Sequence, residues 1–380
     1  MITTINNKHN KLNVPNLRFP EFEGEWRRSK FKKVITLQRG SSPRPIIKYI
    51  TTSTDGVNWI KIGDMPHFGR IVTSTEEKIT REGAKKSRLV KKGDLILSNS
   101  MSYGLPYIMG VDGYIHDGWF VLKDFEDTFD KDYLCNLLIS SAIQNQYKRL
   151  AAGGVVQNIS SDLVNSVSVS IPLMEEQKKI SSLLNLIDDR IATQNKIIDK
   201  LQSLIKGIRN KLFENDKDWR KAKIREFLCI GNGKDYKHLD IGDIPVYGTG
   251  GKMLSVNDFL YDGDSVCIGR KGTIDTPLFL TGKFWTVDTL FYTYGFKDVL
   301  PKFCYYLFKQ INWQLYNEGT GVPSLSKSTI ENIKVRIPSI IQQYKICYIL
   351  DCYEDKIKNE GLILDLYCSQ KQYLLRQMFV

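Results

Sequence analysis

Short glycine-bounded segments hold the side chains of this sequence that are best suited to chemistry. LQRGSSPRP (37–45) places Arg39, Ser41 and Arg44 where a glycine and two prolines oppose helix formation. SNSMSYG (98–104) offers hydroxyls, an amide and an aromatic ring in a similar setting. Guanidinium and amide groups can pair with the edges of guanine and adenine, while hydroxyl, amine and backbone N–H groups bind phosphates. These segments therefore indicate contact with a nucleic acid.

Matching segments recur in the second half of the chain, at VYGTGGK (246–252) and GRKGT (269–273). A third pair, GGVVQNIS (153–160) and GTGVPSLS (319–326), is shared by both halves. Any one of these segments could be an ordinary turn between strands, but their matching places in both halves favour a binding role. The predicted nucleic-acid contacts are Arg39, Ser41, Arg44, Ser98, Asn99, Ser102, Tyr103, Gln157, Asn158, Tyr247, Thr249, Lys252, Arg270, Lys271, Thr273, Thr320 and Ser324.

Motifs for catalysis are missing from the sequence. GTGGK (248–252) resembles a phosphate-binding loop, but Val246 stands where the first glycine is needed and Met253 where Ser or Thr is needed. The four histidines are isolated, without an HExxH pattern or a metal-ligand spacing. No Pro-Pro dipeptide forms the (Asp/Asn)-Pro-Pro-aromatic loop with which amino-methylating enzymes hold the target nitrogen, and no GxSxG occurs. The sequence therefore predicts neither a catalytic site nor a metal site.

The charge of the chain favours a polyanionic partner. Its 54 Lys and Arg against 42 Asp and Glu give a formal net charge of +12. Basic residues are densest at 26–33, 81–92 and 219–225, where each single run could also be a solvated face. Charge alone does not separate DNA from RNA or from a membrane surface.

Cysteine usage and hydropathy indicate the compartment. The seven cysteines form no CxxC pair, which is typical of buried thiols in a reducing cytoplasm. No apolar run approaches the ~20 residues that span a bilayer. We therefore expect a cytoplasmic protein without a membrane partner.

The sequence elements that must position these segments occur twice in the chain. A constant offset of 166 positions aligns 153–213 with 319–379 without a gap, as from Gly153 to Gly319. VSIPLMEEQKKI (169–180) and VRIPSIIQQYKI (335–346) lie within this shared block. A period this long indicates a duplicated pair of domains, each a variable block followed by a shared block.

Each shared block contains a long amphipathic helix. In the first, apolar residues alternate at spacings of four and three, which is an a/d heptad seam, and acidic residues at its start suit the helix dipole. The second seam is poorer, since Gly361 inside it costs about 1 kcal/mol relative to Ala. The predicted pairing positions are Ile180, Leu184, Ile187, Ile191, Gln194, Ile198 and Leu201, with Ile346, Leu350, Ile357, Glu360 and Leu364.

Connectivity predicts that the two helices run antiparallel, because the second then returns the chain to the first block. Gln194 would face Glu360 near the middle and fix the register. The variable blocks are rich in short strands, such as 94–98 and 265–269, with helical stretches at 132–151 and 301–319. We therefore expect a mixed α/β (α+β) protein with pseudo-two-fold symmetry. Its predicted parts are a flexible N-terminus (1–15), a first recognition domain (16–172), a first spacer helix (173–214), a second recognition domain (215–338) and a second spacer helix (339–380).

Over nearly its whole length, the sequence resembles a known family, the specificity subunits of type I restriction–modification systems. The resemblance rests on NLRFPEF before the first block, GSSPRP, WIKIGD and GDLILSNS within it, and IP followed by EEQ at the first helix. In the second block it rests on IPVYGTGG, DGDSVCIGRKGT and FWTVDT. The second helix departs from the pattern, because IIQQYKI replaces the acidic start and Gly361 interrupts the seam.

The resemblance implies a subunit without activity of its own. Two target recognition domains would read a bipartite, asymmetric double-stranded DNA target, and the two helices would dock two methyltransferase subunits. Those partners use S-adenosylmethionine to methylate adenine. A restriction and translocase subunit that uses ATP and Mg²⁺ would cut unmethylated DNA. This chain would need no cofactor of its own.

Two other interpretations stay open from the residues alone. The chain could be a DNA methyltransferase or nuclease with an unrecognised active site. It could also be a non-catalytic scaffold that joins two proteins through its coiled coil, with incidental basicity.

Overall fold

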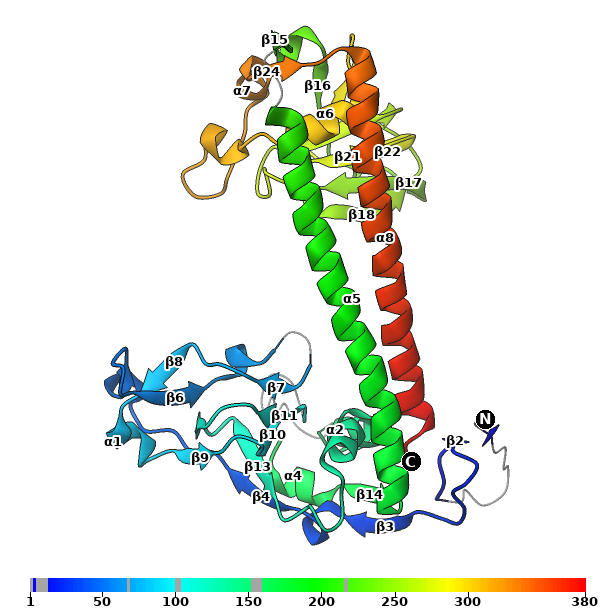
Figure 1. Ribbon diagram of the computed structural model, residues 1–380. Coiled ribbons are helices and arrows are strands. Elements are labelled where there is room, and N and C mark those ends of the chain that lie inside the picture. Colours follow the sequence, from blue (N-terminus) through cyan, green and yellow to red (C-terminus); the bar gives the residue numbers. More distant parts are fainter. Residues whose placement is uncertain (1–2, 5–12, 67–68, 100–103, 152–158, 215–217) are drawn as a thin grey trace. The chain divides into compact units, whose positions relative to one another are not determined.

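The computed structural model describes residues 3–4, 13–66, 69–99, 104–151, 159–214 and 218–380. The chain divides into two compact units (Figure 1). The first unit contains Met1–Lys196 and Gly361–Val380, and the second contains Ile197–Glu360. Each unit is a sheet-rich domain together with one part of each of two long helices, α5 (Met174–Glu214) and α8 (Ile340–Gln377).

Two five-stranded sheets form the domain of the first unit. The central strand of the first sheet, Leu95–Ser98, begins with three aliphatic residues and is buried along its whole length, because both faces of the strand are covered. In order, the first sheet is β4 (Thr36–Arg39), β13 (Trp119–Lys123), β10 (Leu95–Ser98), β11 (Pro106–Met109) and β7 (Ile71–Val72). The second is β5 (Ile50–Thr51), β8 (Glu77–Ile79), β6 (Val57–Ile60), β12 (Gly113–Ile115) and β9 (Arg88–Val90).

Short helices pack on both of these sheets. Side chains of Thr80, Asp130 and Ser160 cap three of them by accepting hydrogen bonds from backbone N–H groups of the first turn. The helices are α1 (Arg81–Ala84), α2 (Lys131–Ile139), α3 (Ser141–Ala151) and α4 (Ser161–Ser166), with 3₁₀ turns η1 (Phe31–Lys33), η2 (Ile46–Lys48) and η3 (Ile62–Asp64). The two-stranded pairs are β1 (Thr3–Thr4) with β2 (Leu17–Arg18) and β3 (Arg27–Lys30) with β14 (Ser168–Ile171).

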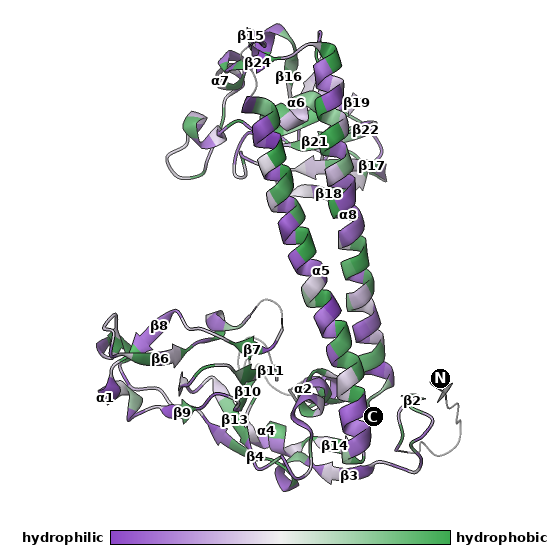
Figure 2. Ribbon diagram, viewed as in Figure 1, coloured by the Kyte–Doolittle hydropathy of each residue, from purple (hydrophilic) through white to green (hydrophobic). Residues whose placement is uncertain are grey.

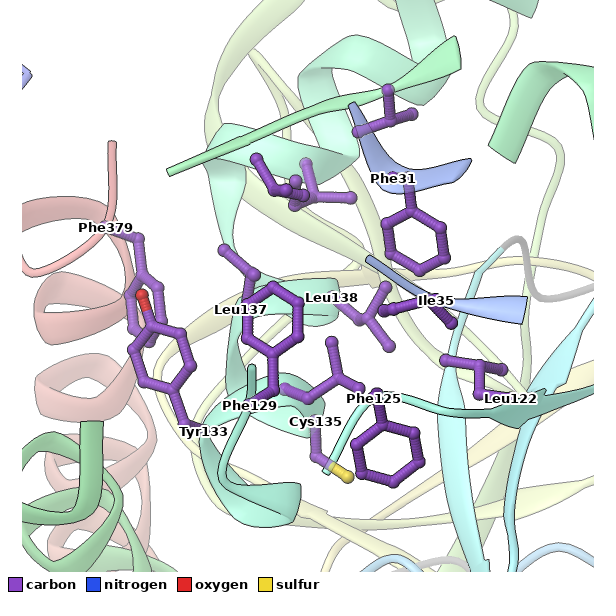
Figure 3. Packing of buried hydrophobic residues seen from close by; sticks show 14 of the residues in the cluster. Phe31, Ile35, Leu122, Phe125, Phe129, Tyr133, Cys135, Leu137, Leu138 and Phe379 are labelled. Atoms are coloured by element: carbon purple, nitrogen blue, oxygen red, sulfur yellow. The ribbon is translucent and has the colours of Figure 1, made fainter. Parts of the chain in front are cut away.

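One buried cluster joins this domain to its helix ends. Side chains of α2 and of the segment before it, among them Phe129 and Tyr133, pack between the sheet and the end of α8 (Figure 3). The rings of Tyr133 and Phe379 lie 5.3 Å apart between centroids. Burial of such side chains is the main driving force for this packing.

The second unit repeats this plan with smaller sheets. Its first sheet is β16 (Cys229–Asn232), β23 (Leu290–Tyr294), β20 (Ser265–Gly269) and β21 (Leu278–Leu280). Its second sheet is β18 (Gly251–Val256), β17 (Ile241–Gly248), β22 (Lys283–Thr286) and β19 (Tyr261–Asp262). A pair, β15 (Arg220–Lys223) with β24 (Lys334–Ile337), lies beside α6 (Pro301–Phe308), α7 (Lys327–Asn332), η4 (Ile224–Glu226) and η5 (Trp313–Tyr316).

The duplication seen in the sequence recurs as repeated hydrogen bonds. The buried Gln177 side chain donates to the Pro172 carbonyl at 3.0 Å, and Gln343, 166 positions later, donates to Pro338 at 3.0 Å. Ser160 and Ser326 cap α4 and α7 in the same way. Each glutamine ties the start of a long helix to the strand that precedes it.

The two predicted helical stretches are wrong in detail. The first breaks at Ser140, whose hydroxyl donates to the Leu137 carbonyl at 2.6 Å and competes with helix continuation. The second ends at Phe308, where the Trp313 indole N–H donates to the Phe308 carbonyl at 2.9 Å. The second unit therefore follows α6 with a short 3₁₀ turn where the first unit has the 11-residue helix α3.

The long helices match the prediction in length and direction. α5 has 41 residues and α8 has 38, and α5 is about 60 Å long. In the first unit Asp188 pairs with Lys371 and Arg190 lies over the ring of Tyr367, so the helices run antiparallel there. Hydrophobic and hydrophilic positions alternate along both helices (Figure 2). None of the described helices is long and apolar enough to cross a membrane.

Most predicted seam positions are shielded from solvent. Ile180, Leu184, Ile187, Gln194, Ile346, Leu350 and Glu360 are buried, and Ile191, Ile198, Leu201, Ile357 and Leu364 are half-buried. Gln194 and Glu360 belong to different units, so their pairing stays a prediction. The predicted division into separate domains and spacer helices also stays a prediction.

Candidate nucleic-acid interface

The first loop cluster, made of segments 39–45, 98–99 and 116–118, lies at the end of β4, β10 and β12. Gly40 follows β4 directly and its N–H donates to the Trp119 carbonyl at 2.9 Å. A Cβ at Gly40 would overlap the carbonyl oxygen of His116, so this close approach requires glycine. The glycine thus locks the segment with Arg39, Ser41 and Arg44 onto the turn between β12 and β13.

Asp117 is the hub of this cluster. Its carboxylate accepts hydrogen bonds from the Ser42 hydroxyl at 2.8 Å and the Arg44 guanidinium at 3.2 Å. Its carbonyl oxygen accepts from the Asn99 amide at 2.8 Å and from the Arg39 guanidinium at 3.3 Å. One aspartate therefore holds three segments together while the Arg39 and Arg44 side chains remain exposed.

The ionisation of the turn follows from its surroundings. Burial raises the pKa of Asp117, but hydrogen bonds from Ser42 and from its own backbone, with the charges of His116 and Arg44, outweigh burial and lower it. Burial lowers the pKa of His116 against the opposing charges of Asp117 and Asp64. The Nδ1 of His116 accepts a hydrogen bond from the Gly118 N–H at 2.8 Å. The cluster thus presents an anionic hub with exposed cations around it.

Two predicted contacts in this unit lie inside the domain. Ser98 and Asn99 are only 1% and 3% exposed. The Ser98 hydroxyl accepts from the Leu105 N–H at 3.1 Å. These side chains therefore shape the loops from within. Ser102, Tyr103, Gln157 and Asn158 lie outside the described residues.

The second loop cluster, made of segments 247–252, 269–273, 287–289 and 317–324, joins the corresponding parts of the second unit. The Gly272 N–H donates to the Pro323 carbonyl at 2.9 Å, and Lys271 forms a bridge with Ser324. A Cβ at Gly272 would lie 3.7 Å from the Thr249 hydroxyl, so the turn of the β17–β18 hairpin adjoins these loops. The three segments singled out in the sequence thus meet at one place.

The two clusters share one backbone frame. Asn99 N–H donates to Gly118 at 3.0 Å and Arg270 N–H donates to Thr289 at 2.7 Å. Their carbonyls accept from Ile159 at 2.7 Å and from Leu325 at 2.9 Å, residues that are 166 positions apart. Asn99 and Arg270 are therefore equivalent positions, but Asn99 is buried and Arg270 is exposed.

The remaining predicted contacts of the second unit are open to solvent to different degrees. Arg270 donates to the Asp288 carbonyl at 3.4 Å and its guanidinium carbon lies 6.0 Å from the Phe291 ring centre. Lys252, Arg270, Lys271, Thr273 and Thr320 are exposed, while Tyr247, Thr249 and Ser324 are half-buried. Such a surface can bind phosphates and base edges.

Sequence reasoning missed three residues of these clusters. Asp117 has no motif of its own, and only its contacts reveal its role. Arg88 is exposed and donates to the Arg39 carbonyl at 3.0 Å, and its basic run (81–92) was the signal that could have found it. Asn317 accepts from the backbone N–H groups of Gly319 and Ser324, both at 2.9 Å, and so folds the third segment of the second unit.

The described residues hold no group of three or more His, Cys, Asp or Glu side chains that could bind a metal ion. All seven cysteines are free thiols. Burial raises the pKa of Cys135 to about 11.

The model of the type I restriction modification DNA specificity domain matches residues 23–203 and 216–365 of this chain. The EcoprrI specificity subunit of Escherichia coli is 19% identical over 360 residues, which cover 87% of this chain and 88% of that protein. A putative MjaX specificity subunit of Methanocaldococcus jannaschii is 24% identical over 399 aligned positions, with 89% of each chain covered.

Solved structures show the same fold. The type I restriction–modification S subunit from M. genitalium matches with a TM-score of 0.60 and 17% identity, covering 97% of this chain and 99% of that chain. A chain from work on complex assembly and conformational transition of a type I R-M system matches with a TM-score of 0.61 and 14% identity, covering 92% and 96%. With both halves matched by the family model, the chain belongs to the type I restriction–modification DNA specificity family, the non-catalytic, target-recognising component of these systems.

Proposed function

We propose that this chain recognises a bipartite, asymmetric DNA target and positions methyltransferase and restriction subunits on it. Each unit would read one half-site through its loop cluster. The partners would supply the chemistry, with S-adenosylmethionine for adenine methylation and with ATP and Mg²⁺ for cleavage of unmethylated DNA. The chain itself would act in the cytoplasm and need no cofactor.

The strongest support for this proposal is the backbone frame that the two loop clusters share. The two loop clusters share a backbone frame, with equivalent hydrogen bonds at Asn99 and Arg270, but display different side chains. A frame that holds variable exposed groups suits two readers of two different sequences. A scaffold with incidental basicity gives no reason for glycines that lock these particular loops.

The helices offer surfaces for partner subunits. On the first turns of α8, Ile341, Tyr344 and Tyr348 are 65%, 62% and 73% exposed and recur at helical spacing. We call these three residues the α8 stripe. The equivalent positions on α5, 166 residues earlier, are Glu175, Lys178 and Ser182, all exposed. Two methyltransferase docking sites built on these helix starts would therefore differ in chemistry.

A domain exchange tests the proposal in the assembled complex. Residues 16–172 are replaced by the corresponding segment of another specificity subunit, and modified adenines are mapped by single-molecule sequencing of host DNA. We expect one half of the methylated motif to change and the other half to stay as in the parent. A change in both halves, or a complex that forms and methylates with the parental motif, would contradict the proposal.

A further inference from the structure

A groove of about 770 Å³ lies on the second unit, at the other end of β16 from the loop cluster. Glu226, which ends the turn η4 before β16, lines the groove, whereas Gly233 after β16 packs against the loop cluster. Its floor is apolar, because Phe213, Trp219 and Leu307 line it, and the rings of Trp219 and Phe213 lie 5.6 Å apart between centres. The groove is therefore separate from the predicted DNA contacts.

The rim of this groove is cationic. Lys221, Lys223, Lys334 and Arg336 line it from β15 and β24, and Glu226 is the one acidic side chain among the described lining residues. Lys221 and Lys334 are exposed. The Nε2 of Gln310, which also lines the groove, is buried and has no hydrogen-bond partner in the described part of the chain. Such a buried donor is satisfied when a water molecule or a bound ligand supplies an acceptor.

The first unit fills the corresponding place with its own chain. Ser168, equivalent to Lys334, binds the Gln146 amide of α3 through its backbone N–H at 2.9 Å and its carbonyl at 2.8 Å. Ser170, equivalent to Arg336, donates to Asn13 at 2.9 Å. In the second unit, which has no described helix like α3, these positions line an open groove. The groove is thus not required by the shared fold.

The chemistry of the groove selects its occupant. A DNA backbone would match a cationic surface without a hydrophobic floor, because its exposed groups are phosphates and sugars. An apolar floor under a cationic rim instead fits a peptide segment in which carboxylates flank an apolar side chain. The α8 stripe also lies close to the groove in sequence, because β24, which lines the groove, is followed by α8.

We propose that this groove binds an acidic segment of the methyltransferase subunit, with an apolar side chain on Trp219 and carboxylates at Lys221 and Lys334. The inference rests on the proposed function and adds a binding site to it. Since the first unit covers the equivalent place, this contact is made on one side of the complex only.

Charge reversal tests the site in the full chain. The groove variant is Lys221→Glu/Lys334→Glu. The control is Arg27→Glu/Arg28→Glu, which reverses two exposed cations on β3 of the first unit, where Gln146 and Asn13 cover the paired strand β14. Affinity for the methyltransferase subunit of the same system is measured by calorimetry without DNA. We expect the groove variant to weaken binding about tenfold or more and the control to weaken it less than about threefold. Equal effects of the two variants, or none, would overturn the inference.

Photo-crosslinking keeps the test independent of charge. A benzoylphenylalanine replaces Ile311, which lines the groove, or Leu315, which is 77% exposed outside the lining set, in the assembled complex. We expect Ile311 to capture a methyltransferase peptide rich in Asp and Glu and Leu315 not to capture it. Capture of DNA, or of this chain alone, refutes the inference. If the wild-type chain forms no complex with the methyltransferase, the proposed function fails as well; a normal complex unaffected by the groove variants sinks the inference alone.

Discussion

The two loop clusters are built on one frame and differ in what the frame displays. In the first, Asn99 turns inward to the Asp117 carbonyl, and exposed cations come from the neighbouring segment at Arg39 and Arg44. In the second, the equivalent Arg270 turns outward and rests near Phe291. The backbone bonds are kept because they hold the loops, and the side chains are free to vary because they carry specificity.

The starts of the long helices differ in a similar way. In the first unit Glu176 is 1% exposed and accepts from Arg18 at 2.8 and 2.9 Å and from the Trp26 indole at 3.2 Å. The equivalent residue of the second unit is the exposed Gln342, which caps its own helix by accepting from the Ser339 N–H at 3.2 Å. The buried ion pair thus holds an N-terminal segment against the first unit. In the second unit the uncharged Gln342 cannot form an ion pair of this kind.

The largest expected effect comes from breaking that ion pair. Arg18→Leu leaves the Glu176 carboxylate buried without its partner, which should lower the free energy of unfolding by about 3–5 kcal/mol. Chemical denaturation followed by tryptophan fluorescence measures the loss. The double variant Arg18→Leu/Glu176→Gln, which copies the uncharged residue of the second unit, should recover most of it. Equal destabilisation by both variants would show that the charge is not the cause.

Next in size is the loss of a locking glycine. A Cβ at Gly40 would overlap the His116 carbonyl, and a Cβ at Gly233 would overlap the Val287 carbonyl. We expect Gly40→Ala and Gly233→Ala each to destabilise their unit by about 1–3 kcal/mol. Gly63 and Gly250 have no atom within 4 Å of an added Cβ, so alanine there serves as the matched control in each unit.

Denaturation midpoints of the four alanine variants measure this effect. Only the locking pair should shift, and each should also impair recognition of its own half-site in adenine mapping. A shift at the control positions as large as at Gly40 and Gly233 would contradict the proposed locking role.

The equivalent pair Asn99 and Arg270 separates stability from recognition. Arg270→Ala should weaken binding of the target DNA by about 1–3 kcal/mol and relax one half-site, with stability nearly unchanged. Asn99→Ala should lower the free energy of unfolding by about 1 kcal/mol, because it removes a buried hydrogen bond. Fluorescence anisotropy with target and scrambled duplexes, next to denaturation, distinguishes the two outcomes. The same pattern at both positions would remove the contrast between the clusters.

Much of this architecture could be predicted from the sequence. The heptad seam predicted the long helices, because Ile180, Leu184 and Leu350 recur at coiled-coil spacing and are buried. The 166-residue offset predicted the equivalence of the two units, and the glycine-bounded segments were singled out at matching places in both halves. These features depend on local spacing, which a sequence records directly.

Burial at the loop clusters could not be predicted. Ser98 and Asn99 have the composition of surface contacts, yet tertiary hydrogen bonds hold them inside. Asp117 gathers Ser42 and Arg44, which lie 75 and 73 positions away along the chain. No local pattern carries such long-range pairings. The interruption of the predicted helix at Ser140 could not be foreseen either, because helix propensity does not account for one hydroxyl that competes for a backbone carbonyl.

The smallest expected effect is the change in the salt dependence of DNA binding when one phosphate contact is removed. The assembled chain should bind DNA with a slope near −7 of log K against log salt if about eight phosphates are neutralised. Lys271→Ala, at the exposed rim of the second cluster, should reduce the magnitude of that slope by about one and weaken target and scrambled DNA alike. Lys297 is exposed but its N–H donates to Phe227, near the groove end of the domain, so Lys297→Ala should leave the slope unchanged. A slope that is flat in the parent, or that changes equally in both variants, would mean that the cationic loops do not face the DNA backbone.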